Sequence, residues 1–156
     1  MKSLKPFCFL LLLALMGYGC KKSESSVEKQ LEEDEQLIKE YLAANNLTAQ
    51  RHQSGIYYII SNPGSGTFTY TTETKVEVKY TLRLLGGSVI PQTTDPISFR
   101  LSGVISGWQI GVPLIQPGGK IRLLLPSFYA YGPDVRPGIP ANSVLDYDID
   151  LLNVTY

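Results

Sequence analysis

The sequence predicts an α+β fold, in which an antiparallel β-sheet curls over one short helix and a longer helix precedes the sheet. Two observations predict it. Apolar residues recur at roughly helical spacing between residues 27 and 42, but at every second position in the segments after residue 54. Turn-forming residues, as in Asn62-Pro-Gly-Ser-Gly66, then divide the second region into segments of strand length.

Residues 1–19 have the composition of a secretory signal peptide. Two lysines near the start precede an apolar run from Phe7 to Met16, and small residues follow before Cys20. This run is too short for a stable helix across about 30 Å of hydrocarbon, so it is not predicted to span a membrane. We therefore expect residues 1–19 to be removed on export.

The cysteine that follows this segment predicts a bacterial lipoprotein, in which Cys20 becomes the lipidated first residue. Gly17 departs from that pattern, because such signals usually carry a leucine three positions before the cysteine. Since Cys8 would leave with the signal, acylation is the natural use of the remaining thiol. The protein is expected to be exported and anchored to a membrane through Cys20, on the periplasmic side or at the cell surface. Ordinary secretion with a chance cysteine is the alternative.

Residues 20–53 are predicted to form a lipidated tether and a helix. Ser25 or Ser26 caps the helix, acidic residues follow in its first turn, and Asn45-Asn46 ends it. Such a helix could pack on the folded domain, pair with another chain or stand as a spacer, because its apolar stripe is thin. The stripe consists of Val27, Leu31, Ile38, Tyr41 and Leu42.

Residues 54–156 are predicted to form the folded domain, with five strands and one brief helix. Alternation of apolar and polar residues over 76–84 is typical of a half-buried strand. The same alternation, or a short β-rich run, predicts strands at 56–60, 97–101, 121–125 and 145–151. Only the stretch 108–115 could be helical, and Pro113 limits its length.

Charge and residue content argue against several classes of function. The chain has 14 basic and 14 acidic residues, and without residues 1–19 the net charge becomes −2. A near-neutral surface without a basic stripe argues against a nucleic-acid partner. His52 is the only histidine, which excludes a histidine zinc cluster and a serine–histidine triad.

Two motifs that resemble ligand sites are incomplete. Asp146, Asp148 and Asp150 lack the glycine and the glutamate of a calcium loop, and they are expected on the water-facing side of a strand. Gly118-Gly119-Lys120 lacks the remaining residues of a phosphate-binding loop and is expected to be a turn. No metal and no cofactor is therefore expected.

One segment instead indicates an apolar pocket. Val104-Ile-Ser-Gly-Trp-Gln-Ile-Gly111 places the only tryptophan, Trp108, between two glycines and after two β-branched residues. Tyr131 lies in a second motif that ends in glycine, Tyr129-Ala-Tyr-Gly132. Trp108 is predicted to form the floor of the pocket and Tyr131 to lie in its wall. Plain packing in the core is the alternative for each aromatic residue.

These motifs, in this order, resemble those of the FKBP-type peptidyl-prolyl cis-trans isomerases, and the resemblance covers about residues 54–156. It implies an FKBP-like fold. It also implies a catalytic site made of the Tyr131 hydroxyl, the backbone N–H of Ile105 as donor to a substrate carbonyl, and the Trp108 floor. The substrate-binding residues that it implies are Tyr80, Ile90, Ile97, Phe99, Val104, Ile139 and Tyr147.

The chain departs from the family pattern at Ile90-Pro91, where the family usually carries a Phe-Asp pair. The lost carboxylate argues against tight macrolide binding and for a lower turnover. Asp95 lies close in sequence and could replace it.

The resemblance implies prolyl isomerisation as the activity, with proline-containing polypeptides, exported proteins among them, as partners. An apolar pocket suits this reaction, because no bond breaks and no nucleophile is needed. The enzyme must only favour the twisted amide over the planar one, against a barrier of about 18–20 kcal/mol. Two other functions stay open, namely a peptide-binding holdase on the same fold and a surface-anchored structural domain without a proline pocket.

Overall fold

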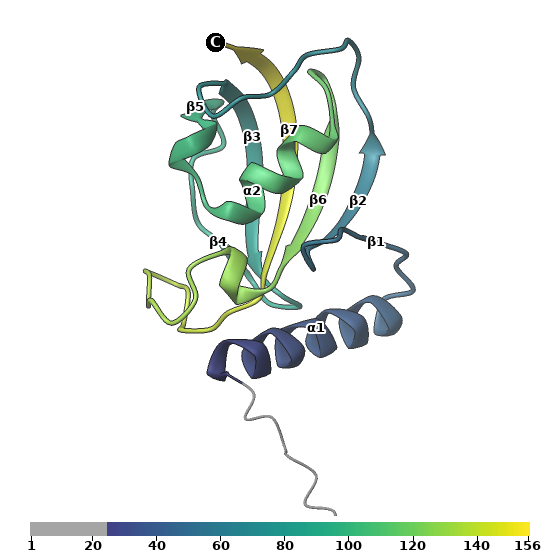
Figure 1. The fold of residues 1–156 in the computed structure, drawn as a ribbon, viewed down its shortest axis with the longest axis vertical. Helices are drawn as coiled ribbons and strands as arrows, with labels where there is room; N and C mark the ends of the chain where they lie inside the picture. Colours follow the sequence, from purple (N-terminus) through teal and green to yellow (C-terminus); the bar gives the residue numbers. More distant parts are fainter. Residues whose placement is uncertain (1–24) are drawn as a thin grey trace, which may run out of the picture.

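The computed structural model describes residues 25–156, in which a short helix crosses one face of a curved antiparallel sheet and a longer helix lies across one end of the sheet (Figure 1). The predicted signal peptide and Cys20 lie outside the described residues. Within residues 25–156, no helix is both long enough and apolar enough to cross a membrane.

The sheet has seven strands in the order β1-β2-β6-β7-β3-β4, with β5 also pairing with β3, and every pair is antiparallel. The five predicted strands are confirmed as β2, β3, β5, β6 and β7. The sequence does not predict β1 and β4, because strands of two residues are too short to show a period. The bounds are β1 Gln50–Arg51, β2 Tyr57–Asn62, β3 Lys75–Leu84, β4 Val89–Ile90, β5 Ile97–Arg100, β6 Lys120–Leu125 and β7 Leu145–Thr155.

The short predicted helix is confirmed as α2 (Ser106–Gly111), followed by the 3₁₀ turn η2 (Val112–Leu114). It crosses one face of the sheet (Figure 1). Two glycines let it lie close to β6: a Cβ at Gly107 would lie 2.5 Å from Leu125 Cδ1, and a Cβ at Gly111 would lie 2.6 Å from Leu123 Cδ1. The glycines on either side of Trp108 are therefore explained by close packing of helix and sheet.

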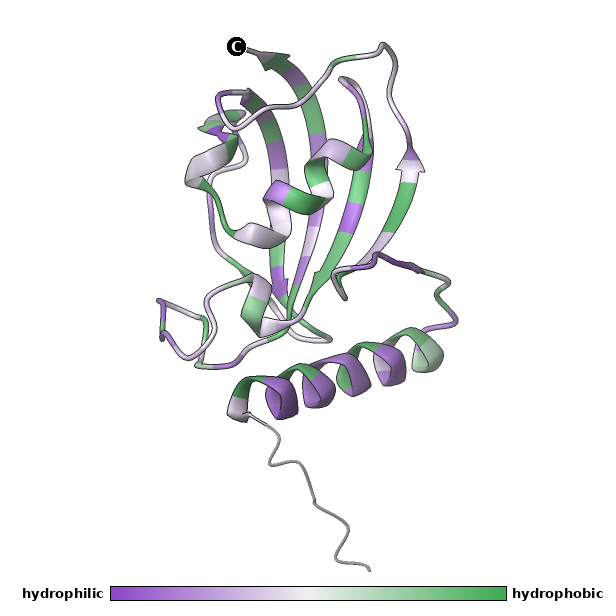
Figure 2. Ribbon diagram, in the orientation of Figure 1, coloured by the Kyte–Doolittle hydropathy of each residue, from purple (hydrophilic) through white to green (hydrophobic). Residues whose placement is uncertain are grey.

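The long helix α1 (Ser26–Ala44) begins and ends as predicted. Ser25 and Glu28 form a reciprocal capping box, and Asn45 follows the last turn. Of the predicted apolar stripe, Ile38 and Leu42 are buried, whereas Val27 is 47% exposed. Figure 2 shows the apolar side of α1 turned toward the domain.

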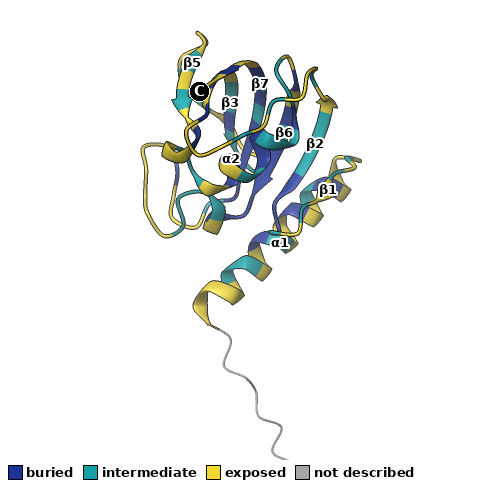
Figure 3. Cartoon of the chain, turned by 45° about the horizontal axis from the view of Figure 1, so that its top comes forward, coloured by how far each residue is buried: buried dark blue, intermediate teal, exposed yellow. Residues whose placement is uncertain are grey.

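Helix α1 packs on the domain. Of the three arrangements that the sequence leaves open for this helix, the structure supports this one. Ile38 and Leu42 form a second small core with Tyr57, Leu124 and Val144. Leu124 points away from its neighbours Leu123 and Leu125, which face α2, because successive side chains of a strand alternate between the two faces. Helices α1 and α2 thus cover opposite faces, and α1 lies across one end of the sheet (Figures 1 and 3).

The expectation that all three aspartates of β7 face water is wrong for Asp146. Asp148 and Asp150 are partly exposed, but Asp146 is 1% exposed. Its carboxylate accepts hydrogen bonds from Arg83 and Arg122, and Arg122 also donates to the Tyr41 hydroxyl on α1. Helix α1 covers this end of the strand, and the two guanidinium groups compensate the buried charge.

Candidate functional site

An open cavity of about 220 Å³ lies between α2, β3, β5, β7 and the loop that follows β6. Its volume suits a single ring-sized group better than a drug-sized ligand, for which pockets of about 300–1,000 Å³ are usual. No charged side chain is among the residues that line it. They are Tyr80, Phe99, Gly103, Val104, Ile105, Trp108, Tyr131 and Tyr147.

Trp108 forms the floor of this cavity and is held rigidly by three other aromatic rings. It is 3% exposed. Tyr80, Tyr147 and Phe99 pack edge-on against it, with ring centroids 5.0, 5.3 and 5.8 Å away. Such edge-to-face pairs are each worth about 0.5–1.5 kcal/mol beyond the area they bury. The indole Nε1 is buried and donates to no group within residues 25–156.

The hydroxyl groups of Tyr80, Tyr131 and Tyr147 give the cavity its polar character. Burial raises the pKa of Tyr80 and, more strongly, that of Tyr147, and the neighbouring Tyr131 raises both further. Tyr80 and Tyr147 therefore stay neutral at ordinary pH and can donate hydrogen bonds without adding charge.

The rim on the α2 side is made of backbone as well as side chains. The 3₁₀ turn η1 (Leu101–Gly103) leads through Val104 to Ile105, the residue that caps α2. In the described part of the chain, the Ile105 N–H has no hydrogen-bond acceptor. It is one of the orphan donors of a helix start and is free to bind a ligand.

The opposite rim is the loop from η3 (Ser127–Tyr129) to β7. Tyr131 lies in this loop, and the Arg136 guanidinium lies 5.4 Å from the centre of its ring. Arg136 and Ile139 close a tight turn through two backbone hydrogen bonds of 2.9 and 2.8 Å. Gly138, within that turn, has a φ of 77°, a conformation that favours glycine.

The structure brings together seven of the ten side chains that the sequence proposes for the site. The seven are Tyr80, Phe99, Val104, Ile105, Trp108, Tyr131 and Tyr147. Gly103 also lines the cavity but is not predicted, since a glycine in a short turn carries no chemical signal of its own.

Ile90, Ile97 and Ile139 are not among the residues that line the cavity, and their contact with substrate stays a prediction. All three belong to, or pack against, the same hydrophobic core as Trp108 and Tyr147. Ile97 pairs with Val78 in the sheet, and Ile139 is 5% exposed. Ile90 lies beside the turn from Arg136 to Ile139, with its Cγ2 3.5 Å from where a Cβ of Gly138 would be. It therefore packs against this turn.

No carboxylate is among the residues that line the cavity, and Ile90-Pro91 stands where the family usually carries a Phe-Asp pair. Asp95 is exposed and is not among the lining residues, so its replacement of the missing acid stays a prediction. In the same loop, Gln92 Nε2 donates to the Tyr80 backbone oxygen at 2.8 Å. The loop after β4 is thus tied to β3 by a neutral side chain.

The residues that line the cavity suit the binding of an apolar ring and a carbonyl group. No group of three or more metal-ligating side chains occurs within residues 25–156. His52 lies away from the cavity, with its Nδ1 2.9 Å from Ser54 Oγ. The cavity offers an aromatic floor for an apolar ring, together with the Tyr131 hydroxyl and the Ile105 N–H as donors for a carbonyl oxygen.

Comparison with known proteins agrees with this geometry. Residues 66–152 match the model of the family described as FKBP-type peptidyl-prolyl cis-trans isomerase. The chain is 36% identical over 137 residues to the FKBP-type peptidyl-prolyl cis-trans isomerase FkpA of Escherichia coli strain K12, which covers 85% of this chain and 50% of the relative. It is 35% identical over 148 residues to FkpA of Aeromonas hydrophila, covering 90% of this chain and 55% of the relative.

Two solved structures share the fold. The crystal structure of FkpA from Escherichia coli has a TM-score of 0.69 at 35% identity, and the match covers 82% of this chain and 62% of that one. A peptidyl-prolyl cis-trans isomerase from Pseudomonas syringae pv. tomato has a TM-score of 0.68 at 29% identity, covering 86% and 99%. The chain spans about half the length of the FkpA proteins that it matches.

Proposed function

Because the chain belongs to the FKBP-type peptidyl-prolyl cis-trans isomerase family, we propose that it catalyses the cis–trans isomerisation of X-Pro bonds in polypeptides. The observation that carries this proposal is the uncharged aromatic cavity over Trp108, with two hydrogen-bond donors at its rims.

The reaction follows from the physical properties of the cavity. A planar X-Pro amide is stabilised by resonance, and rotation to the twisted form is slow, taking tens to hundreds of seconds without a catalyst. The prolyl ring would pack on the Trp108 indole, and the Ile105 N–H would bind a substrate carbonyl and hold the backbone in place. The amide loses polarity as it twists, so an apolar cavity favours the transition state over the planar ground state.

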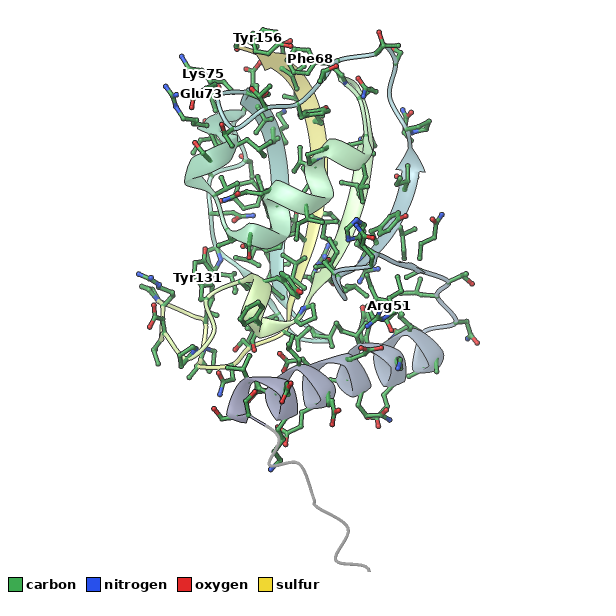
Figure 4. All side chains as sticks on the ribbon, viewed as in Figure 1. Arg51, Phe68, Glu73, Lys75, Tyr131 and Tyr156 are labelled. Atoms are coloured by element: carbon green, nitrogen blue, oxygen red, sulfur yellow. The ribbon has the colours of Figure 1, made fainter. Side chains whose placement is uncertain are left out.

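The Tyr131 hydroxyl supplies the second donor, and removing it tests the proposal. We expect the purified chain to accelerate isomerisation of a short Xaa-Pro peptide, and Tyr131→Phe to lower kcat/KM by about tenfold, the loss expected for one hydrogen bond of about 1.4 kcal/mol. Tyr156→Phe is the matched control, since Tyr156 is 72% exposed at the end of the sheet far from Tyr131 (Figure 4). No acceleration by the unmodified chain would contradict the proposed activity.

A peptide-binding holdase remains the second candidate, because no carboxylate is among the residues that line the cavity and Ile90-Pro91 stands where the family usually carries a Phe-Asp pair. Binding of the same peptide without any acceleration would support it. Loss of both binding and acceleration would support a purely structural domain.

We further propose that the protein is an exported lipoprotein whose clients are other exported proteins. Support comes from the basic start, the short apolar run and the small residues before Cys20. Labelled fatty acid should be incorporated into the unmodified protein and not into Cys20→Ser, which should leave the membrane fraction. Equal labelling of both proteins would contradict anchoring at Cys20, and protease treatment of whole cells would distinguish the cell surface from the periplasmic side.

A further inference from the structure

A buried carboxylate links helix α1 to the loop that carries Tyr131. Asp34 is 0% exposed, although it lies on a helix rich in exposed charges. Its Oδ2 accepts hydrogen bonds from the Ser127 backbone N–H at 2.7 Å and from the Ser127 hydroxyl at 2.6 Å. Its Oδ1 accepts a third from Gln30 Nε2 at 2.9 Å. These three hydrogen bonds compensate the charge of the buried carboxylate.

The η3 turn requires this carboxylate because it has no side-chain cap of its own. Pro126 precedes the turn and offers no side-chain acceptor, so the Ser127 N–H would otherwise be an unpaired donor in a buried position. Asp34 provides the oxygen that a capping residue usually provides, from a position 93 residues earlier in the sequence.

Ser127 in turn fixes the backbone on both sides of Tyr131. Its carbonyl oxygen accepts hydrogen bonds from the Ala130 N–H at 2.9 Å and from the Gly132 N–H at 2.8 Å. Tyr131 lies between these two donors, so its position over the cavity depends on the position of Ser127.

We propose that Asp34 is a positioning residue for prolyl isomerisation, which acts by holding Ser127 and thereby the Tyr131 hydroxyl at the rim of the cavity. This inference rests on the proposed function. It also gives helix α1 a role in catalysis beyond packing against the domain.

Helix α1 has other attachments that do not involve this loop, so the role of Asp34 can be tested without detaching the helix. Ile38 and Leu42 are buried in the second core. Glu35 accepts hydrogen bonds from Arg51 at 3.1 and 3.0 Å and from the Tyr57 hydroxyl at 3.0 Å. We expect α1 to stay docked when Asp34 alone is changed.

The first test compares Asp34→Ala with Glu33→Ala in the full chain. Glu33 is the neighbouring residue on the same helix, and its side chain is 55% exposed, so Glu33→Ala removes the same charge without touching the loop. We expect Asp34→Ala to lower kcat/KM by about tenfold, as for loss of an oriented donor, and Glu33→Ala to have no effect. Asp34→Asn should recover most of the activity, because its amide oxygen can accept both Ser127 hydrogen bonds. Equal activity of the two alanine variants would overturn the proposal.

The second test separates positioning of Tyr131 from a general loss of stability. If Asp34 acts through the Tyr131 hydroxyl, Asp34→Ala should have almost no further effect on kcat/KM in a Tyr131→Phe background. If Asp34→Ala lowered kcat/KM by the same factor in both backgrounds, Asp34 would not act through Tyr131. The wild type, Asp34→Ala, Tyr131→Phe and the double variant must all be fully folded at the assay temperature. Circular dichroism checks this.

A third measurement tests the link even if the unmodified chain is inactive. Hydrogen exchange of the Ala130 and Gly132 amides should speed up in Asp34→Ala and not in Glu33→Ala, because these amides depend on Ser127. Unchanged exchange in Asp34→Ala would overturn the link. An inactive chain whose exchange does respond would count against the proposed function alone.

Discussion

Replacing Gly107 by alanine would test whether α2 must lie this close to the sheet for the site to form. A Cβ at residue 107 would lie 2.5 Å from Leu125 Cδ1 and 3.0 Å from the Tyr129 backbone oxygen. Favourable contacts between carbon atoms need about 3.5–4.0 Å. Leu125 is fully buried, and Tyr129 belongs to the η3 turn before Tyr131, so neither neighbour can give way without disturbing the core or the loop.

The expected loss of stability follows from these distances. Adding a methyl group to a filled core costs about 1–3 kcal/mol, and the higher helix propensity of alanine offsets at most about 1 kcal/mol. We expect Gly107→Ala to lower the free energy of unfolding by roughly 1–2 kcal/mol and the Tm by roughly 3–8 °C for a chain of this size. Activity should fall as well, because the displaced α2 carries Trp108.

Thermal unfolding followed by circular dichroism measures this effect, with Gly103→Ala as the matched control for stability. A Cβ at residue 103 meets no atom within 4 Å, so we expect its free energy of unfolding to stay within about 0.5 kcal/mol of the wild type. A Tm of Gly107→Ala equal to or above that of the wild type would refute the close packing of α2 on β6.

Three further predictions concern charge and binding. Between about pH 5 and 9, kcat/KM should be flat, because no carboxylate or histidine lines the cavity; a step between about pH 5 and 7 would reveal an ionising group in the mechanism. Hydrogen bonds from Arg51 and Lys39 lower the pKa of Glu35 from 4.5 to about 2, so its contribution to stability is complete above pH 4.5 and is lost as the pH falls toward 2. Urea unfolding should therefore show a smaller loss of stability between pH 7 and 3 for Glu35→Gln than for wild type. Identical losses in the two proteins would contradict this role of Glu35. Finally, Trp108→Ala should weaken binding of a proline peptide while Asp148→Ala on the other face leaves it unchanged; equal effects in calorimetry would argue against this cavity.

The sequence predicts the strands and the short helix well, because their apolar residues follow a clear period. Val76 to Leu84 alternates over its whole length, and it forms β3 as expected. The pocket aromatics are predicted by motif order, and Trp108 and Tyr131 do lie at one cavity. Periodicity gives no information on β4, which has two residues, nor on the direction in which Ile90 points from it.

Contacts between distant segments could not be predicted in the same way. Asp34 looks like one more solvated charge on a charged helix, and nothing local marks it as the partner of Ser127. Asp146 fits the alternation of β7, and only the placement of α1 over that end of the strand buries it. In both cases the docking of α1, which depends on a second small core, decides whether a charge is exposed.

Titrating the isotopically labelled chain with a short Xaa-Pro peptide, observed by NMR, tests the proposed site most directly. We expect the backbone amide of Ile105 and the indole N–H of Trp108 to shift as the peptide binds, while the exchange between its cis and trans signals accelerates. Accelerated exchange with neither resonance shifted would place the catalysis elsewhere on the molecule and contradict the role of this cavity.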